Sequence, residues 1–376
     1  MAAVESLPVR RDGGRMRVPE LDLLRFIAAL AVVFYHYTYR LRLNGSIEDP
    51  YPALGRATLH GYLGVELFFM ISGFVVLWSA IGKRPSEFVV SRATRLYPEF
   101  WIGVVVSAIV FSLAGQIAGG VGLPMLIANL TMVPHLFGFG YVDGVYWTLF
   151  VELKFYFLIW ILLLTGQIRH VETWVRVWFV ATVACFVLPM PGVLRSITMV
   201  PFAPLFIAGC VFYLVRSQRL TPSRAAMIVG CGIMSVVHVL DAMPEFVHDS
   251  DIHLATRIEA SAIIVAMFLT FSWISIYPRE RSTGKLIVWL GMLTYPLYLL
   301  HNAGKMTIMR PFAGEHRVLA LVAALTLSLL LSATVVLLVE KRRKQLTLLL
   351  QGHYSRIRNE AALRFAPQRG SRPAGD

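Results

Sequence analysis

Long apolar runs separated by short polar segments dominate the chain. A helix of about 20 apolar residues crosses the hydrocarbon core of a bilayer, and in lipid the backbone must satisfy its own hydrogen bonds. The runs are continuous rather than alternating, which excludes a β-barrel. We therefore predict an all-α polytopic membrane helix bundle of about ten transmembrane helices, over residues 21–39, 60–80, 97–117, 145–165, 174–190, 197–215, 225–241, 256–277, 286–303 and 318–338.

One further apolar stretch, residues 121–139, does not fit this pattern. It is interrupted by Pro124, Pro134, His135 and several glycines. Its length and its helix breakers suit a re-entrant or interfacial segment better than a complete crossing. Counting it as a span would invert the orientation of every later helix, so we leave it out of the ten.

Composition and charge support a membrane protein. The chain is 57% hydrophobic and 15% charged, whereas soluble domains carry about a quarter charged residues. The net charge of +13 does not require a nucleic acid partner, because basic clusters beside membrane helices serve topology and contact anionic lipid headgroups. The three cysteines fall inside apolar runs, so neither a disulfide framework nor a metal site is expected.

The distribution of basic residues predicts the orientation. With the N-terminus inside, most Lys and Arg residues fall in cytoplasmic segments, and the external loop 242–255 contains none. Both termini are therefore expected in the cytoplasm. We divide the chain into a basic N-terminal arm at 1–18, a transmembrane domain at 19–340, and a basic tail at 341–376 that we expect to be disordered.

Ionisable residues inside the spans are functional candidates, because charge in the bilayer is costly. Arg25 and His36 lie on one face of the first span, separated by about 16 Å along the axis. Snorkelling to headgroups is the alternative for Arg25, and a structural hydrogen bond between helices is the alternative for His36. Glu66, expected at the depth of His36, would orient its imidazole.

Arg92 and Arg95 stand three residues apart, so they share a helical face at the cytoplasmic mouth. Paired guanidinium groups suit phosphate because they offer forked donors and permanent charge. Topology and lipid contact are the alternative explanation for this pair.

Two later spans contribute further polar candidates for the same cavity. Glu152 and Tyr156 are four apart and share a face of the fourth span, and Trp147 lies near the start of that span. Tyr295 and His301 belong to the ninth span, where the tyrosine could instead be an interfacial aromatic. The candidates form two groups by their expected depth in the membrane. The outer group contains His36, Glu66, Glu152 and His301, and the cytoplasmic group contains Arg25, Arg92 and Arg95.

Five sequence blocks, taken in order, resemble the membrane acyltransferase family 3. The resemblance covers roughly residues 18–340, and we expect the stand-alone form without a fused hydrolase-like domain. One departure is the terminal Glu-basic-Pro motif, which reads Glu340-Lys341-Arg342 here. The blocks are Arg25-x10-His36, Gly64–Phe74, Arg92-x-x-Arg95, Trp147–Tyr156 and Tyr295–His301.

The resemblance implies a multi-pass enzyme of the bacterial cytoplasmic (inner) membrane. Such an enzyme O-acylates, mostly O-acetylates, a sugar of a cell-surface polysaccharide, lipid-linked glycan or glycoside. The implied donor is acyl-coenzyme A, with no permanently bound cofactor. The implied partners are the acceptor glycan and the lipid bilayer. A multi-pass transporter or flippase for a glycan or small anion is the alternative function.

The resemblance also implies roles for individual residues. His36 matches the essential histidine of the family and Arg25 its partner arginine, while Arg92 and Arg95 match a pair tied to donor handling. His36 would act as general base with Glu66 orienting its ring, or it would carry the acyl group in a covalent relay.

Overall fold

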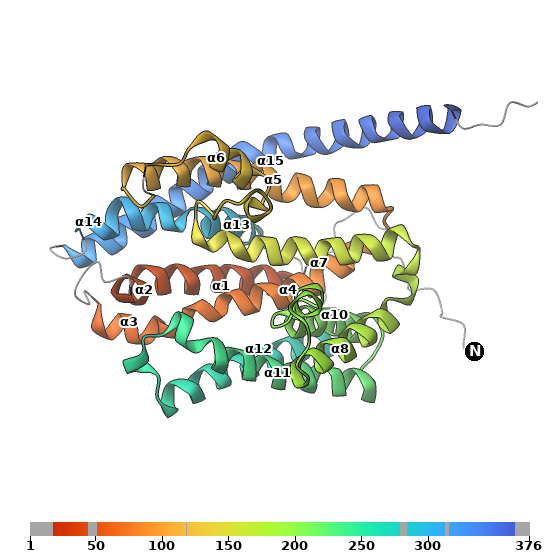
Figure 1. Cartoon of the computed structure of the whole chain (residues 1–376), viewed down its shortest axis with the longest axis horizontal. Helices are drawn as coiled ribbons and strands as arrows, with labels where there is room; N and C mark the ends of the chain where they lie inside the picture. Colours follow the sequence, from red (N-terminus) through yellow and green to blue (C-terminus); the bar gives the residue numbers. More distant parts are fainter. Residues whose placement is uncertain (1–17, 44–50, 118, 279–283, 313–315, 365–376) are drawn as a thin grey trace, which may run out of the picture.

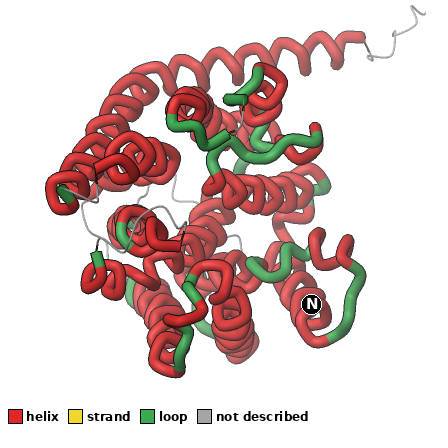
Figure 2. The backbone as a smooth tube through the Cα atoms, turned by 60° about the vertical axis from the view of Figure 1, so that its left-hand side comes forward, coloured by secondary structure: helices red, strands yellow, loops and turns green. Residues whose placement is uncertain are grey.

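The computed structural model describes residues 18–43, 51–117, 119–278, 284–312 and 316–364, and every regular element in these ranges is a helix. This confirms the all-α prediction (Figures 1 and 2). In chain order the helices are α1 (Pro19–Tyr37), α2 (Tyr39–Leu43), α3 (Pro52–Thr58), η1 (Leu59–Leu63), α4 (Gly64–Ala80), α5 (Pro85–Leu113), α6 (Leu123–Leu130), η2 (Pro134–Phe137), η3 (Gly144–Tyr146), α7 (Trp147–Leu164), η4 (Gln167–His170), α8 (Val171–Val187), α9 (Gly192–Ile197), α10 (Ala203–Ser217), α11 (Pro222–Phe246), η5 (Asp249–Asp251), α12 (Leu254–Ile276), α13 (Lys285–Gly304), η6 (Lys305–Met309), α14 (Arg310–Phe312) and α15 (Arg317–Arg364).

Nine helical stretches of the described chain are long and apolar enough to cross a membrane. The remaining predicted span corresponds to α10, which has only 15 residues and is therefore about 22 Å long. The nine stretches are Pro19–Leu41, Pro52–Ala80, Pro85–Leu113, Gly144–Leu164, Gln167–Val187, Pro222–Phe246, Leu254–Ile276, Lys285–Met309 and Arg317–Glu340.

Helix α10 packs closely against α4, and glycines on both helices permit this approach. A Cβ atom added to Gly73 would lie 2.3 Å from the carbonyl oxygen of Phe206, and one added to Gly209 would lie 2.2 Å from that of Met70. Small residues of this kind allow helix backbones to approach in membranes. Almost every residue of α10 is buried, so the protein itself surrounds this short helix.

The broken stretch at 121–139 is not a complete crossing. It contains α6, whose eight residues rise only about 12 Å, and the short helix η2. The Asn129 side chain donates to the Gly140 carbonyl and accepts from the Val142 amide, so the segment folds back on itself. Trp101 of α5 donates to the Leu130 carbonyl and fixes the segment against the bundle.

The beginning of α1 and the middle of α15 lie at the same end of the bundle, because Val18 and Leu21 line one cavity together with Glu340 and Arg343. Counted together, the nine long stretches and α10 make ten crossings, and an even number returns the chain to the side where it started, in agreement with this placement. Helices α2, α3 and α14 gather at the opposite end (Figure 1).

The tail corrects one expectation. Helix α15 continues to Arg364 and projects beyond the bundle, although we expected disorder from residue 341 onward (Figure 1). The segment is rich in Lys, Arg, Gln, Leu and Ala, which favour helix, and no proline occurs before Pro367. Residues 1–17, most of the expected N-terminal arm, and residues 365–376 lie outside the described residues.

Helix α13 connects several parts of the bundle, because it packs against α1, α5 and α15. It contains Pro296 and runs directly into η6, a π-helical turn. Prolines and π-turns alter the regular hydrogen-bond ladder of a helix and occur often at functional sites.

Candidate functional site

Two adjoining cavities lie within the bundle, one of about 100 Å³ and one of about 480 Å³. We call them the narrow cavity and the wide cavity. The narrow cavity is formed by residues of α1, α4, α5, α7 and α13, and the wide cavity adds residues of α15. Both are lined by Arg25, Val75, Arg92, Arg95, Gly291 and Tyr295.

Three arginines therefore surround the junction of the two cavities. Arg25 comes from α1, and Arg92 and Arg95 come from successive turns of α5. From the sequence we expected these three residues in one group at one depth, and the structure brings them together. Arg25 is oriented by Asp22, one turn earlier, whose carboxylate lies 3.2 Å from the Arg25 guanidinium.

Arg92 is buried between two aromatic rings. Its guanidinium carbon lies 5.7 Å from the ring centroid of Phe88 and 5.7 Å from that of Tyr156. A guanidinium group stacks favourably on aromatic faces. The Nε atom of Arg92 is buried and has no hydrogen-bond partner among the described residues, so this side chain retains donor capacity at the cavity wall.

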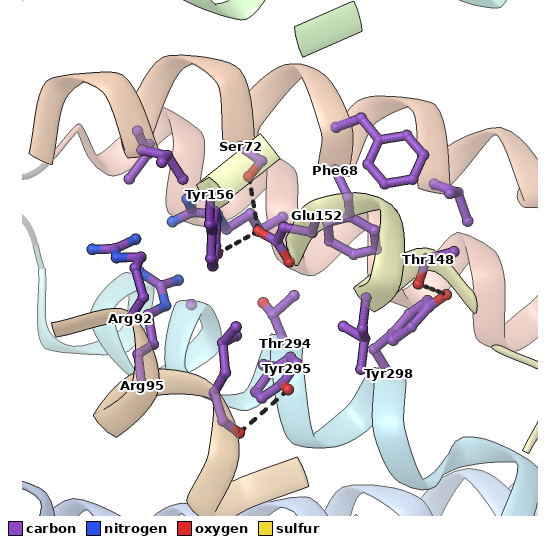
Figure 3. Close-up of a pocket in the computed structure, with 18 residues that line it drawn as sticks. Phe68, Ser72, Arg92, Arg95, Thr148, Glu152, Tyr156, Thr294, Tyr295 and Tyr298 are labelled. Carbon is purple, nitrogen blue, oxygen red and sulfur yellow. Dashed lines mark hydrogen bonds between the residues drawn. The ribbon is translucent and has the colours of Figure 1, made fainter. Parts of the chain in front are cut away.

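A carboxylate lies in the middle of the narrow cavity. Glu152 Oε1 accepts hydrogen bonds from the Ser72 hydroxyl at 2.8 Å and from the Tyr156 hydroxyl at 2.6 Å. Figure 3 shows Glu152 between the Arg92 end and the Thr148 end of the cavity. The prediction that Glu152 and Tyr156 share a face is confirmed, and Glu152 lines the cavity that the three arginines also line.

His36 is oriented by its own helix. Its Nδ1 atom lies 2.9 Å from the Val32 carbonyl oxygen. A carbonyl oxygen can only accept, so Nδ1 carries the hydrogen and Nε2 of the neutral ring carries the lone pair. The ring of His301 lies 4.8 Å from that of His36, centroid to centroid.

Glu66 has a different position from the one expected. Gly64 of α4 packs against Ala28 and Val32, which precede His36 on α1. The two helices are antiparallel, so Glu66, two residues after Gly64, lies closer than His36 to the end where α1 begins. Within the described chain no hydrogen bond or ion pair joins Glu66 to His36, and the orienting contact comes from Val32. Glu66 is buried, and its Oε2 atom has no hydrogen-bond partner among the described residues.

His301 lies between the narrow cavity and His36. Its Nδ1 atom lies 2.7 Å from the Tyr298 carbonyl oxygen, and the Tyr298 ring, which lines the cavity, is 5.9 Å away. The Tyr298 and Thr148 hydroxyls are hydrogen-bonded at 2.8 Å at the end of the cavity opposite the arginines (Figure 3). Neither histidine is among the described residues that line the two cavities.

The two remaining candidates have different surroundings. Tyr295 lines both cavities, and its hydroxyl points to the Leu96 carbonyl at 3.4 Å. Trp147 lines neither cavity among the described residues; its ring packs at 6.4 Å from Phe69 and 5.2 Å from Phe202. Trp147 therefore belongs to an aromatic packing cluster.

Several charged residues of the wide cavity were not among the residues predicted from the sequence. Asp22, Glu99 and Arg343 line it, as does Glu340, whose carboxylate is 2.8 Å from the Arg343 guanidinium. Glu99 lies inside an apolar run, so the rule that selected Arg25 should also have selected it. Asp22 precedes Arg25 by three residues, the spacing at which helical side chains meet.

The described residues include no group of three or more His, Cys, Asp or Glu side chains placed to hold a metal ion. The polar side chains that line the two cavities, or lie beside them, carry guanidinium, carboxylate, hydroxyl and imidazole groups.

The family model for the acyltransferase domain of acyltransferase family 3 matches residues 18–337. This range includes every residue that lines the two cavities except Glu340 and Arg343 of α15. The chain belongs to this family. The five sequence blocks that resemble the family lie on α1, α4, α5, α7 and α13, the same helices that form the narrow cavity.

Three curated proteins match parts of this acyltransferase chain. It is 30% identical over 158 residues to nodulation protein 10 of Rhizobium leguminosarum bv. viciae, a match that covers 36% of this chain and 41% of that protein. It is 30% identical over 194 residues to acyltransferase MdmB of Streptomyces mycarofaciens, 47% of each. It is 39% identical over 80 residues to exopolysaccharide production protein ExoZ of Rhizobium meliloti (strain 1021), 20% and 24% respectively.

The chain thus spans less than half the length of the curated relatives that it matches. No solved structure matches it.

Proposed function

We propose that this family member is an integral-membrane O-acyltransferase that moves a short acyl group, acetyl in the first instance, from acyl-coenzyme A to a sugar hydroxyl. The acceptor is a cell-surface polysaccharide, a lipid-linked glycan or a glycoside. The observation that carries the proposal is the path from the three junction arginines through the narrow cavity to Tyr298 and the histidines behind it. Family membership supports acyl transfer, and the name of ExoZ supports a polysaccharide acceptor.

The donor end of this path suits a polyanion. Arg25, Arg92 and Arg95 offer forked, permanently charged donors to the phosphates of coenzyme A. The wide cavity, about 480 Å³, would hold the polar end of the coenzyme, and its thioester arm would extend along the narrow cavity past Glu152. The donor enters from the cytoplasm, where coenzyme A is made, at the end where α1 begins.

The acceptor end supplies the base. The acceptor hydroxyl oxygen attacks the thioester carbonyl carbon while His36 Nε2 takes the hydroxyl proton. The carbon–sulfur bond then breaks, the new carbon–oxygen bond remains in the ester, and the imidazolium returns its proton to the thiolate of coenzyme A. The Val32 carbonyl keeps the His36 ring in the tautomer that this step needs.

The test uses membranes that contain the full-length chain at equal levels, incubated with labelled acetyl-coenzyme A. Wild type should release coenzyme A thiol and label the surface glycan. His36→Ala should bind the donor but lose transfer by about two orders of magnitude or more. Arg95→Ala should mainly raise the KM for the donor.

The matched control is Arg176→Ala, which removes an exposed arginine that is paired with Glu172 and is not among the described residues lining the cavities. It should behave as wild type. Failure of wild type to consume acetyl-coenzyme A would support the transporter alternative. A labelled acyl-protein that disappears in His36→Ala would replace the general-base step by a covalent relay.

A further inference from the structure

Two imidazole rings face each other at the far end of the path from the arginines. The His36 and His301 ring centroids are 4.8 Å apart with planes inclined by 64°, so the edge of one ring points toward the other. Aromatic rings prefer this arrangement because the ring edge is positive and the face negative. The two residues come from α1 and α13, helices far apart in the sequence that pack against each other.

The hydrogen bonds of both rings fix the same tautomer. His301 Nδ1 lies 2.7 Å from the Tyr298 carbonyl oxygen, as His36 Nδ1 does from that of Val32. Each Nδ1 therefore carries a hydrogen, and each neutral ring has its lone pair at Nε2. His301 is fully buried, and its Nε2 atom has no hydrogen-bond partner among the described residues.

A buried, unpartnered Nε2 requires a reason, because an unsatisfied polar atom costs free energy. The charges around the pair supply one. Lys305 interacts electrostatically with both rings, and Arg40 interacts with His36. A proton taken up by His36 during acyl transfer therefore adds a positive charge beside those of Lys305 and Arg40. The imidazolium would then need an electron-rich neighbour.

Resting on the proposed function, we infer that His301 is a positioning residue that acts through His36. Its neutral imidazole, held by the Tyr298 carbonyl, presents an electron-rich ring and a free lone pair to His36 at the moment when His36 carries the acceptor proton.

The proton balance of the reaction is unchanged by this role. The proton leaves the acceptor hydroxyl for His36 Nε2, where His301 stabilises the charge, and it then passes to the coenzyme A thiolate as the carbon–sulfur bond breaks. His301 forms no bond to the acyl group, and it is the same neutral tautomer before and after turnover. The pair therefore lowers the free energy of the charged intermediate state only.

The first experiment is a kinetic double-mutant cycle in membranes that contain the full chain. His301→Gln keeps polarity and approximate size but removes the ring. It should lower kcat on the order of tenfold to a hundredfold with a donor KM within about twofold of wild type. In the His36→Ala background the same substitution should cause no further loss, because His301 acts only through His36.

His301→Phe provides a second variant in case His301→Gln folds poorly, since it keeps an aromatic ring but has no lone pair. His238→Gln is the matched control, because this half-buried histidine packs on Phe202 away from the pair. Equal losses from His301→Gln in both backgrounds, or a loss confined to KM, would overturn the inference.

The second experiment needs no substrate. Nitrogen NMR of the full chain, labelled at histidine, should show a lone-pair Nε2 resonance for His36 that moves in His301→Gln and stays in place in His238→Gln. An unmoved resonance would overturn the inference. If wild type consumes no acyl-coenzyme A, the proposed function fails instead, while the NMR result still decides whether the two rings are coupled.

Discussion

The Tyr156 hydroxyl donates a 2.6 Å hydrogen bond to Glu152 Oε1, and the ring of the same tyrosine packs against Arg92. One side chain thus joins the carboxylate of the narrow cavity to a guanidinium at the junction of the two cavities. The Ser72 hydroxyl gives Glu152 a second hydrogen bond from α4. The arrangement fixes the Glu152 carboxylate in the cavity that Arg25, Arg92 and Arg95 also line, and we expect it to help orient them.

Tyr156→Phe tests this arrangement, because it removes the hydroxyl and keeps the ring under Arg92. A hydrogen bond to a charged group contributes about 1.5–3 kcal/mol. We expect the KM for acyl-coenzyme A to rise roughly tenfold while kcat falls less than threefold, as measured by thiol release. Tyr277→Phe, at an exposed position after α12, is the control. A donor KM unchanged from wild type would show that the Glu152–Tyr156 bond does not orient the donor site.

Much of the fold follows from the sequence because each span is a local feature. The length of an apolar run decides whether it can cross the bilayer, and the breakers in 121–139 decide that this run does not. Helical spacing likewise places Glu152 and Tyr156 on one face of α7, and it places Arg92 and Arg95 on one face of α5. These predictions need no knowledge of which helices are neighbours.

The vertical offsets between helices could not be predicted in this way. Glu66 lies closer than His36 to the end where α1 begins, because close packing at Gly64 sets how far α4 is shifted along α1. Glu152 lines one cavity with the three arginines, which come from two other helices. The pairing of His36 with His301 also depends on contact between α1 and α13, which no local pattern encodes. The short helix α10 could be recognised as apolar, but its enclosure by other helices could not.

Gly209→Ala tests the packing of α4 on α10. The added methyl would lie 2.2 Å from the Met70 carbonyl oxygen, which belongs to a helix backbone and cannot move aside alone. Forced separation of packed helices costs about 1–3 kcal/mol or more. We expect a clearly lower Tm in detergent and less monodisperse protein in size-exclusion chromatography. Gly232→Ala is the control, since its methyl would meet Phe268 at 3.7 Å, an ordinary contact. Equal Tm values for the two variants would contradict the packing argument.

Asp143 provides a prediction about pH. It lies in the loop before η3, fully buried, and accepts hydrogen bonds from Asn302 Nδ2 at 2.8 Å and the Val145 amide at 3.2 Å. Burial raises the pKa of Asp143 from 3.8 to about 6. The folded protein therefore binds this proton more tightly than the unfolded chain, and stability is lost as the pH rises from about 4 through about 6.

Asp143→Asn should remove that loss. The amide oxygen of the variant can accept both hydrogen bonds, while its side chain does not ionise. We expect a Tm close to wild type near pH 4 and a few degrees above wild type near pH 7.5, measured in one detergent across the series. A pKa rise of two units corresponds to about 3 kcal/mol at most, since each unit is 1.36 kcal/mol. A variant whose Tm falls with pH as steeply as that of wild type would assign the loss to another group.

The orientation of the bundle in the membrane can be tested through α15. Its extension beyond the bundle lies at the end where α1 begins, and the excess of basic residues predicts that this end faces the cytoplasm. Green fluorescent protein fused after Asp376 should therefore fluoresce, and alkaline phosphatase at the same site should be inactive. A phosphatase inserted in the loop 242–255, which contains no Lys or Arg, should be active. The reverse pattern would place the three arginines on the side away from the coenzyme A pool and would exclude the donor path proposed here.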